Sequence, residues 1–337
     1  MGDKSNKIPY SFLDLAIVGE GKSITQTLHS VLRLAQCAEN LNYSRFWMAE
    51  HHNMANIASS ATSVLIGFVA SGTSKIKVGS GGIMLPNHSS LVIAEQFGTL
   101  DALYPGRIDL GLGRAPGTDQ LTAKALRRND VQIADSFPNQ IEELKNYFSN
   151  TDKQCKVRAF PGEGANVPLW ILGSSTESAY LAAELGLPYV FASHFAPHQL
   201  QQASRIYKRY FKPSSQLQEP YFVACVNAIV AKTSEKAQFL ATSFYKMFLG
   251  IIRNDRKPMQ EPCETMSGVW TAEEEEAVYN MTACSFIGTP EDISEDVQRF
   301  CDILEVDELM ITSPIYDEQE KIISLELFSE VMKKCRK

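Results

Sequence analysis

KIKVGSGGIMLPNHSSLVIAEQFGTLDALYPGRIDLGLG, residues 75–113, holds a strand, a helix and a second strand in one continuous stretch. Residues 75–85 and 107–113 are short apolar runs, whereas residues 89–104 carry apolar side chains at helical spacing. This order, repeating after about 30 residues, is the βαβ unit that joins parallel strands. The stretch therefore predicts a parallel sheet whose faces are covered by helices.

The same unit recurs along the chain. A helical pattern or a longer segment follows each strand-like run, and these runs begin near residues 12, 45, 75, 107, 168, 189, 221 and 307. Eight such units close a (β/α)8 barrel, so we predict an α/β fold of the TIM-barrel type. A doubly wound open sheet is the alternative, but it needs fewer strands or a second domain. We therefore expect residues 1–337 to form a single domain.

Two long insertions interrupt the regular alternation of strands and helices. Residues 115–167 follow the fourth strand and residues 249–300 precede the eighth, and both are too long for simple connections. Long segments that follow barrel strands commonly carry function. We expect the first insertion to form a lid, whereas the second fits a lid or peripheral packing equally well.

The amino-acid composition argues against several classes of protein. The net charge of −7 argues against a nucleic-acid-binding protein. The 7 cysteines are scattered without a C-x-x-C pair, which argues against a disulfide scaffold or a zinc site and favours a reducing compartment. We find neither a signal peptide nor an apolar run of about 18 residues. We expect a cytoplasmic protein that binds neither nucleic acid nor membrane.

The expected helix over residues 60–72 has no polar side. Val64, Leu65, Phe68 and Val69 surround it, with small residues between them. A helix that is apolar all round is covered on two sides. We expect the barrel on one side and a second copy of the chain on the other, which predicts a homodimer.

Two strand ends are rich in glycine. Active sites of such barrels lie at the carboxyl ends of the strands. Gly81 and Gly82 end the third strand, where the backbone approaches something closely or bulges. In the fourth strand Gly111 and Gly113 alternate with large side chains, so we expect these glycines to face the interior and leave space there. Arg114 follows, and its guanidinium suits a phosphate or a salt bridge to a rim carboxylate equally well.

The segment GSSTES, from Gly173 to Ser178, follows the fifth strand. Ser174 and Glu177 fit a capping box at the start of a helix. The hydroxyls of Ser175 and Ser178 surround the same helix start, whose free amides attract anions. With the arginine at the end of the fourth strand, they predict a site for the phosphate of a cofactor.

The segment RFWMAEHHNM, residues 45–54, ends on a carboxylate and two imidazoles. These groups could bind a metal, transfer a proton or cap a buried strand. Neighbours on a strand point to opposite faces, so His51 and His52 would not readily bind one ion. A mononuclear metallohydrolase site drawn from His51, His88 and His194 stays geometrically possible.

Three blocks of sequence resemble the bacterial luciferase-like flavin monooxygenases, above all their single-chain bacterial branch. The blocks are AEHHNM at 49–54, residues 78–119 and residues 170–197, and the likeness extends from residue 13 to about residue 317. The resemblance implies a (β/α)8 barrel that uses reduced FMN (FMNH2) and O2. Some relatives use the deazaflavin F420 instead.

The resemblance also implies roles near the flavin ring. His51 matches the acid/base histidine, and the pair Gly81–Gly82 matches a non-prolyl cis peptide beneath the isoalloxazine ring. Gly113 stands where luciferase itself carries a reactive cysteine, so light emission is not expected.

The same resemblance implies a phosphate site. Arg114 matches an arginine that holds the FMN phosphate, and Gly173, the Ser174 amide, Ser175 and Ser178 match its other side. Luciferase has an acidic residue at the position of Ser174, so we do not expect every detail of its phosphate site in this protein.

The combined expectation is a flavin-dependent monooxygenase. A partner flavin reductase would supply reduced FMN, and one oxygen atom of O2 would pass to a small organic substrate. A flavin-binding or carrier protein without turnover is the main alternative. A metallohydrolase on the same barrel is a further alternative.

Overall fold

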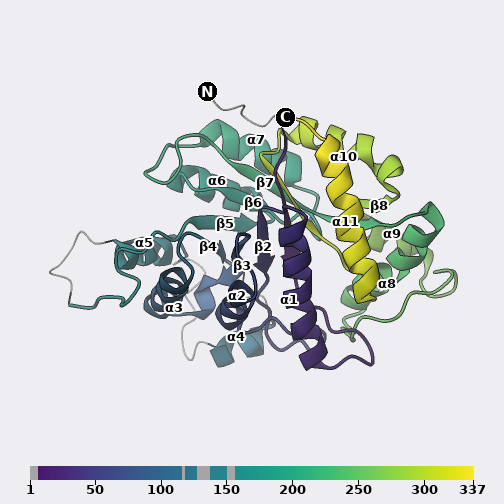
Figure 1. Ribbon diagram of the computed structural model, residues 1–337, viewed down its shortest axis with the longest axis horizontal. Coiled ribbons are helices and arrows are strands. Elements are labelled where there is room, and N and C mark those ends of the chain that lie inside the picture. Colours follow the sequence, from purple (N-terminus) through teal and green to yellow (C-terminus); the bar gives the residue numbers. More distant parts are fainter. Residues whose placement is uncertain (1–6, 116–117, 127–136, 150–155) are drawn as a thin grey trace.

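The computed structural model describes residues 7–115, 118–126, 137–149 and 156–337. Eight parallel strands form a closed ring in the order β1-β2-β3-β4-β5-β6-β7-β9, because β9 pairs back onto β1. The ring strands are β1 (Tyr10–Asp14), β2 (Arg45–Met48), β3 (Lys77–Met84), β4 (Ile108–Gly113), β5 (Leu169–Gly173), β6 (Tyr189–Phe191), β7 (Phe222–Val230) and β9 (Glu308–Thr312). The predicted (β/α)8 barrel is confirmed (Figure 1).

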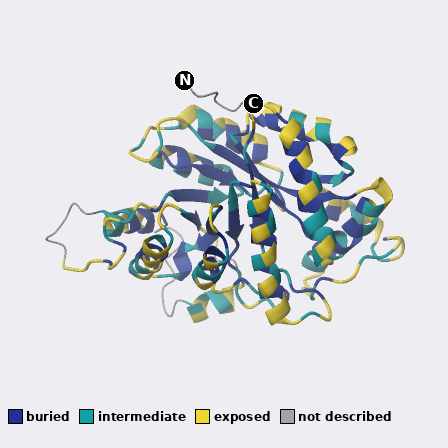
Figure 2. Cartoon of the chain, viewed as in Figure 1, coloured by how far each residue is buried: buried dark blue, intermediate teal, exposed yellow. Residues whose placement is uncertain are grey.

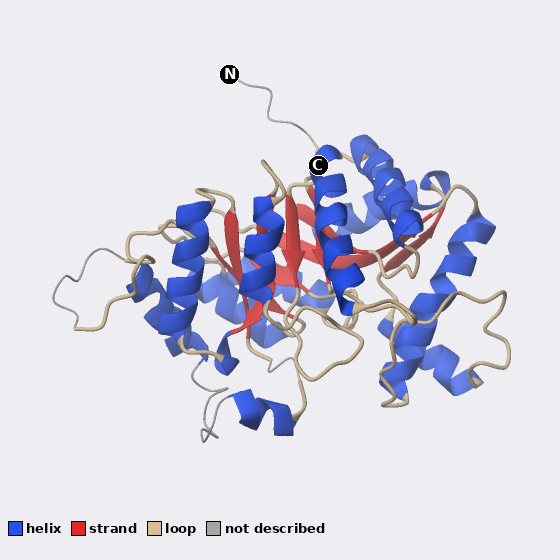
Figure 3. Cartoon of the chain, turned by 60° about the horizontal axis from the view of Figure 1, so that its bottom comes forward, coloured by secondary structure: helices blue, strands red, loops and turns tan. Residues whose placement is uncertain are grey.

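Helices surround the ring (Figure 3). They are α1 (Ile24–Asn40), α2 (Thr62–Ser71), the 3-10 helix η1 (Leu85–Asn87), α3 (Ser90–Leu103), α4 (Gln120–Leu126), α5 (Phe137–Phe148), α6 (Thr176–Leu185), α7 (Leu200–Tyr210), α8 (Ser234–Ile252), α9 (Ala272–Met281), α10 (Pro290–Leu304) and α11 (Glu318–Lys334). Ser23, Thr271 and Thr289 begin α1, α9 and α10 with capping boxes. Each box satisfies two amides that the helix leaves free.

Alternating strand side chains supply two apolar layers. Ile108, Leu110 and Leu112 of β4 join the large cluster that also contains helix residues. A smaller inner cluster is built by side chains of the ring strands, including Trp47 and Trp170. The strands are therefore buried on both faces, and Figure 2 shows them in dark blue. The outward orientation of the large β4 side chains confirms the prediction for this strand.

One strand lies outside the predicted pattern. β8 (Ser285–Gly288) pairs with the last residues of β7, from Asn227 to Val230, and stands outside the ring. β7 is long enough to pair with β6 and β9 through its first half and with β8 through its second half. The expectation of eight strands missed β8 because four residues are too short for a periodic signal.

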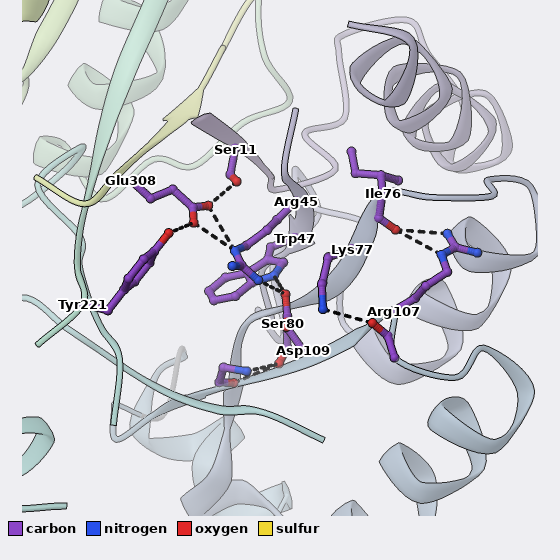
Figure 4. Close-up of polar contacts among 12 residues, drawn as sticks. Ser11, Arg45, Trp47, Ile76, Lys77, Ser80, Arg107, Asp109, Tyr221 and Glu308 are labelled. Carbon is purple, nitrogen blue, oxygen red and sulfur yellow. Dashed lines mark hydrogen bonds and ion pairs between the residues drawn. The ribbon is translucent and has the colours of Figure 1, made fainter. Parts of the chain in front are cut away.

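A buried charged network fills the amino-terminal end of the barrel interior (Figure 4). The Arg45 Nε atom donates to both carboxylate oxygens of Glu308 at 3.1 Å, and its Nη1 atom donates to Asp109 Oδ2 at 2.7 Å. Trp47 and Tyr221 donate further hydrogen bonds to Asp109 and Glu308. Burial opposes the Arg45 charge, but the two carboxylates outweigh it and raise the pKa of Arg45. This end of the barrel is therefore occupied by its own side chains.

Among the described residues we find neither a membrane-spanning helix nor a disulfide bond. None of their helices combines the length and the apolar character that a membrane crossing requires. Cys37, Cys225, Cys263, Cys284, Cys301 and Cys335 are free thiols. The remaining cysteine, Cys155, lies outside the described residues.

Replacing Arg45 tests the network. Arg45→Met leaves the carboxylates of Asp109 and Glu308 buried without a countercharge, so we expect the free energy of unfolding to fall by about 3–5 kcal/mol. Arg33→Met is the matched control, because Arg33 makes an exposed ion pair with Glu318. The control should cost less than about 1 kcal/mol. Urea denaturation measures both, and equal losses would contradict the assignment.

Candidate active site

The carboxyl ends of the strands bring the predicted site residues to one mouth of the barrel. His51 follows β2, the pair Gly81–Gly82 lies within β3, and Arg114 follows β4. The register pairs Gly113 of β4 with Leu172 of β5, so Arg114 lies beside the start of the segment from Gly173 onward. The ring therefore gathers residues that are far apart in the sequence.

The peptide bond between Gly81 and Gly82 is cis, as predicted. The register between β3 and β4 shifts between Ser80 and Ile83, around this bond. A Cβ atom on Gly81 would lie 2.6 Å from Leu13 Cδ1, and one on Gly82 would lie 2.8 Å from the Gly111 carbonyl oxygen. Close packing on both sides accounts for two adjacent glycines.

The expected open space beside the β4 glycines is absent at Gly111. A Cβ atom there would collide with the Ser80 carbonyl oxygen and lie 2.7 Å from Leu172 Cδ1. At Gly113 a Cβ atom would lie 2.8 Å from Met84 Sδ. These glycines allow neighbouring strands and side chains to approach closely, which an alternation pattern alone does not reveal.

The predicted capping box at Ser174 is wrong. The N-cap of α6 is Ser175, and its side chain makes no capping hydrogen bond to the helix amides. The Thr176 amide donates instead to Gln199 Oε1 at 2.9 Å, a partner from the loop before α7. The Ser178 hydroxyl donates to the Ser175 carbonyl oxygen at 2.7 Å and lies 2.8 Å from the Tyr189 hydroxyl. A distant side chain therefore decides where the helix begins.

Arg114 faces this helix start. The pKa of Glu177 is lowered first by a hydrogen bond with Ser175, then by the Glu177 amide, and also by the Arg114 charge. Arg114 itself is exposed and forms no ion pair within 4.0 Å among the described residues. Gly173 must lack a side chain, since a Cβ atom there would collide with the Ser178 hydroxyl. The predicted arginine, serines and glycine are thus brought together, with a carboxylate held among them.

Glu50 ties the ends of β2 and β3 together. Its Oε1 atom lies 2.8 Å from both His52 Nε2 and His88 Nε2, and its Oε2 atom accepts from the Met84 amide at 3.0 Å. Burial raises the pKa of Glu50, but the two histidine hydrogen bonds outweigh it and lower the pKa to about 2. Because Glu50 is therefore ionised, both histidines donate to it.

The alternative metal set of His51, His88 and His194 is not among the possible metal-ligand groups of the described residues. The group of possible metal ligands found among the described residues is Glu50, His52 and His88, whose ligand atoms lie within 4.8 Å of one another. Hydrogen bonds already engage all three. The cluster is accounted for without an ion.

His51 is a partly buried imidazole with an unsatisfied nitrogen. Its Nδ1 atom has no hydrogen-bond partner among the described residues. Burial, and after it the Arg256 charge, lowers the pKa of His51 to about 4 against the effect of Glu50. The imidazole is therefore neutral near pH 7, and its unprotonated nitrogen is a hydrogen-bond acceptor.

His194, after β6, is a second such imidazole. It is 9% exposed, and its Nδ1 atom also has no hydrogen-bond partner in the part of the chain that the structure describes. Burial, with the His51 charge acting in the same direction, lowers the pKa of His194 to about 3. The sequence suggested His194 only as a metal ligand. Its position directly after a strand was the signal that could have marked it as a site residue.

Both insertions reach the loop that carries His51. The Thr118 hydroxyl, from the first insertion, donates to the His52 carbonyl oxygen at 3.0 Å. Arg256, from the second, contacts Met54 Sδ at 3.3 Å. The second insertion is therefore more than peripheral packing, because one of its loops lies beside the mouth.

A cavity of about 230 Å³ lies between α1 and α11, beside the carboxyl ends of β1 and β9. Its lining includes Asp14, Lys22 and Lys321 but none of the predicted site residues. At the mouth, two imidazoles and an arginine have free polar atoms among the described residues, and this chemistry makes the mouth the better candidate for the active site.

Acid titration tests the burial of His51. Since its pKa falls from 6.5 to about 4 on folding, the unfolded state binds the proton more tightly between these values. We expect this residue to cost about 2 kcal/mol of stability at about pH 5 relative to pH 7. In His51→Gln that cost should disappear, whereas the exposed His198→Gln should behave like the wild type. The midpoints of urea denaturation at both pH values measure this cost. An identical pH dependence of stability in all three proteins would contradict the prediction.

The chain is similar to known proteins along most of its length. The model of the luciferase-like monooxygenase family matches residues 11–304. A luciferase-like monooxygenase of Escherichia coli strain K12 is 46% identical over 331 residues, with 98% of each chain covered. An N-acetyl-S-alkylcysteine monooxygenase of Bacillus subtilis strain 168 is 35% identical, over 96% of this chain and 98% of the relative.

Solved structures with a similar fold are also known. The structure of apo-MsnO8 matches with a TM-score of 0.91 and 30% identity, over 98% of this chain and 100% of that one. Two others share the fold at lower identity. The FMN complex of the oxygenating constituent of 3,6-diketocamphane monooxygenase from Pseudomonas putida has a TM-score of 0.71 and 18% identity, over 98% of this chain and 99% of that one. An F420-dependent secondary alcohol dehydrogenase has a TM-score of 0.72 and 13% identity, over 98% and 100%.

The family match covers nearly all of the barrel, and both relatives align along almost the whole chain. The chain therefore belongs to the luciferase-like monooxygenase family and is an oxygen-using oxidoreductase.

Proposed function

We propose that the protein is an FMN-dependent monooxygenase that uses reduced flavin and O2 to oxygenate a small organic substrate. The observation that carries this proposal is the arrangement of Arg114 beside the hydroxyl-lined start of α6, at the same mouth as His51. A cationic group and a helix start suit a phosphate. A neutral imidazole can hydrogen-bond to a reacting group and hold it in place near pH 7.

Arg114, Gly173, Ser174, Ser175 and Ser178 would hold the FMN phosphate. Arg114 has no ion pair within the described residues, so its guanidinium is available to a ligand. The carboxylate of Glu177 already accepts a hydrogen bond from Ser175 and is attracted by the Arg114 charge. An anion bound at this place would make the same interactions. Glu177 is exposed and can turn outward, and a phosphate then takes its place with stronger charge-assisted hydrogen bonds.

His51 would hold or move a proton at its unsatisfied Nδ1 atom. Reduced FMN supplies the electrons that activate O2. Glu50 keeps the ends of β2 and β3 together, and we propose that His51 and the Gly81–Gly82 peptide, which follow or end these strands, both face the flavin ring. The two insertions beside the His51 loop would limit access of water to the reacting atoms.

The cofactor and the substrate belong to the proposal. We propose FMN as the cofactor and F420 as the alternative, since structures of this fold bind either one. A partner flavin reductase would supply FMNH2. The name of the Bacillus subtilis relative suggests N-acetyl-S-alkylcysteines as the first substrates to try.

We also propose that the chain acts as one cytoplasmic domain and assembles as a homodimer. Val64 on α2 is 69% exposed, and Val92 and Leu103 on α3 are 43% and 63% exposed. α2 and α3 are neighbours, and a second copy of the chain would cover these exposed apolar side chains. Sedimentation equilibrium should give twice the chain mass of 37.5 kDa.

Flavin titration tests the phosphate site. Arg114→Gln removes the charge that faces the phosphate, so we expect the affinity for FMN under anaerobic conditions to fall about 10- to 100-fold. Arg209→Gln, an exposed arginine on α7, is the control and should bind normally. Undiminished affinity in Arg114→Gln would contradict the assignment.

Oxygen consumption separates an enzyme from a flavin carrier. With a flavin reductase present, uptake of O2 that depends on an N-acetyl-S-alkylcysteine and yields its oxygenated product would establish turnover. His51→Gln should lower that turnover by about 100-fold or more while flavin affinity persists. A carrier would bind FMN equally well in both proteins and form no product in either. A metallohydrolase would show a stoichiometric metal ion by elemental analysis.

A further inference from the structure

The cavity between α1 and α11 lies on the outer side of the barrel ring. These two helices are neighbours (Figure 1), and Asp14 at the end of β1 lines the cavity together with residues from both. Along β1, Phe12 belongs to the outer apolar cluster and Leu13 to the inner one. Because side chains alternate along a strand, Asp14 points outward, as Phe12 does. The cavity is therefore separate from the interior of the mouth.

Two charged side chains of the cavity wall have no partner. Asp14 is 4% exposed; its Oδ1 atom accepts from the Ala16 amide at 2.8 Å, whereas its Oδ2 atom has no hydrogen-bond partner among the described residues. Lys321, on α11, also lines the cavity. Its ammonium group forms no ion pair within 4.0 Å in the described part of the chain, so it does not pair with Asp14.

The other charged groups of the cavity wall are engaged by the protein. Lys22 Nζ donates to the Tyr316 carbonyl oxygen at 2.6 Å and lies 4.3 Å from the centre of the Tyr316 ring. Arg33 donates to both carboxylate oxygens of Glu318. The groups that remain for a ligand are therefore one carboxylate and one ammonium.

Buried charges are costly unless a group of opposite charge pairs with them. Burial lowers the pKa of Lys321, and the Asp14 charge opposes this without reversing it. A ligand carboxylate beside Lys321 and a ligand ammonium beside Asp14 would each form a charge-assisted hydrogen bond. The smallest common molecule that carries both groups is an α-amino acid.

The size and the walls of the cavity limit the side chain of such a ligand. The volume of about 230 Å³ corresponds to roughly seven or eight waters at about 30 Å³ each, which is too small for a flavin. Val31, Leu34 and Met259 supply apolar surface. Lys22 and Tyr316 line both this cavity and a second pocket, so a ligand can enter between them.

We propose that this cavity binds a free α-amino acid with a small apolar side chain, whose carboxylate pairs with Lys321 and whose ammonium pairs with Asp14. The site is additional to the mouth, and the inference does not rest on the proposed function. Both pairings are intermolecular, so the ligand replaces the ion pair that Asp14 and Lys321 do not form with each other.

Three matched probes separate the two pairings. L-leucine carries both charged groups, 4-methylpentanoate lacks the ammonium, and 3-methylbutylamine lacks the carboxylate. Titration calorimetry with the full chain, without flavin, gives the dissociation constant of each. We expect the wild type to bind L-leucine at least about 10-fold more tightly than either analogue, since each analogue loses one charge-assisted hydrogen bond.

Two variants assign each preference to a residue. Lys321→Met should weaken binding of L-leucine about 10- to 100-fold and remove its advantage over 3-methylbutylamine. Asp14→Asn should remove the advantage of L-leucine over 4-methylpentanoate. Lys333→Met, at an exposed position of the same helix, is the control and should keep both preferences. A side chain with a purely structural role would weaken all three probes alike.

Three results would overturn the inference. The first is that neither L-leucine nor the smaller L-valine binds the wild type at millimolar concentrations. The second is equal affinity of the wild type for all three probes, and the third is unchanged binding of L-leucine in folded Lys321→Met. Thermal melts establish that each variant is folded, and Lys321→Met decides alone if Asp14→Asn is not. Failure of the proposed function would leave these measurements unaffected, because they contain no flavin.

Discussion

The pairing of β9 with β1 is the interaction on which the other features of this protein depend. Phe12 and Ile311, almost 300 residues apart, lie opposite each other in this ladder, and the pairing turns an open sheet into a ring. In a closed ring of parallel strands every carboxyl end points to the same side. Arg114, the start of α6, His51 and His194 meet for that reason alone, since each follows a different strand.

The two ends of the ring differ in how their polar groups are satisfied. At the amino-terminal end, Arg45 bonds to the carboxylates of both Glu308 and Asp109, and one oxygen, Asp109 Oδ1, stays without a partner among the described residues. At the mouth, Nδ1 of His51 and Nδ1 of His194 have no partners among those residues. Buried polar atoms are costly unless they are paired. The first end thus pairs most of its charged atoms within the protein, whereas the mouth holds two imidazoles with unpaired nitrogens.

Several features of the site could be predicted from the sequence because they depend on local residue types. The pair Gly81–Gly82 indicated an unusual backbone, and the bond between them is cis. The serine-rich segment after β5 indicated a helix start at a strand end, although its N-cap is Ser175 rather than Ser174. That error has a tertiary cause, since Gln199 from another loop satisfies the first helix amide. The space expected at Gly111 is likewise filled by Leu172, a neighbour that no pattern within β4 could indicate.

The sequence by itself determined the barrel, because strands and helices that alternate with a regular period leave few ways to bury both faces of a parallel sheet. It also determined which strand ends carry glycine, arginine and serine. Only the tertiary structure decided which side chains meet. It joined Glu50 to His52 and His88, brought Arg256 beside Met54, and set His194 opposite His51. The reason is physical: residue types and their spacing act within one element, whereas contacts across the mouth depend on ring closure and on the paths of the long insertions.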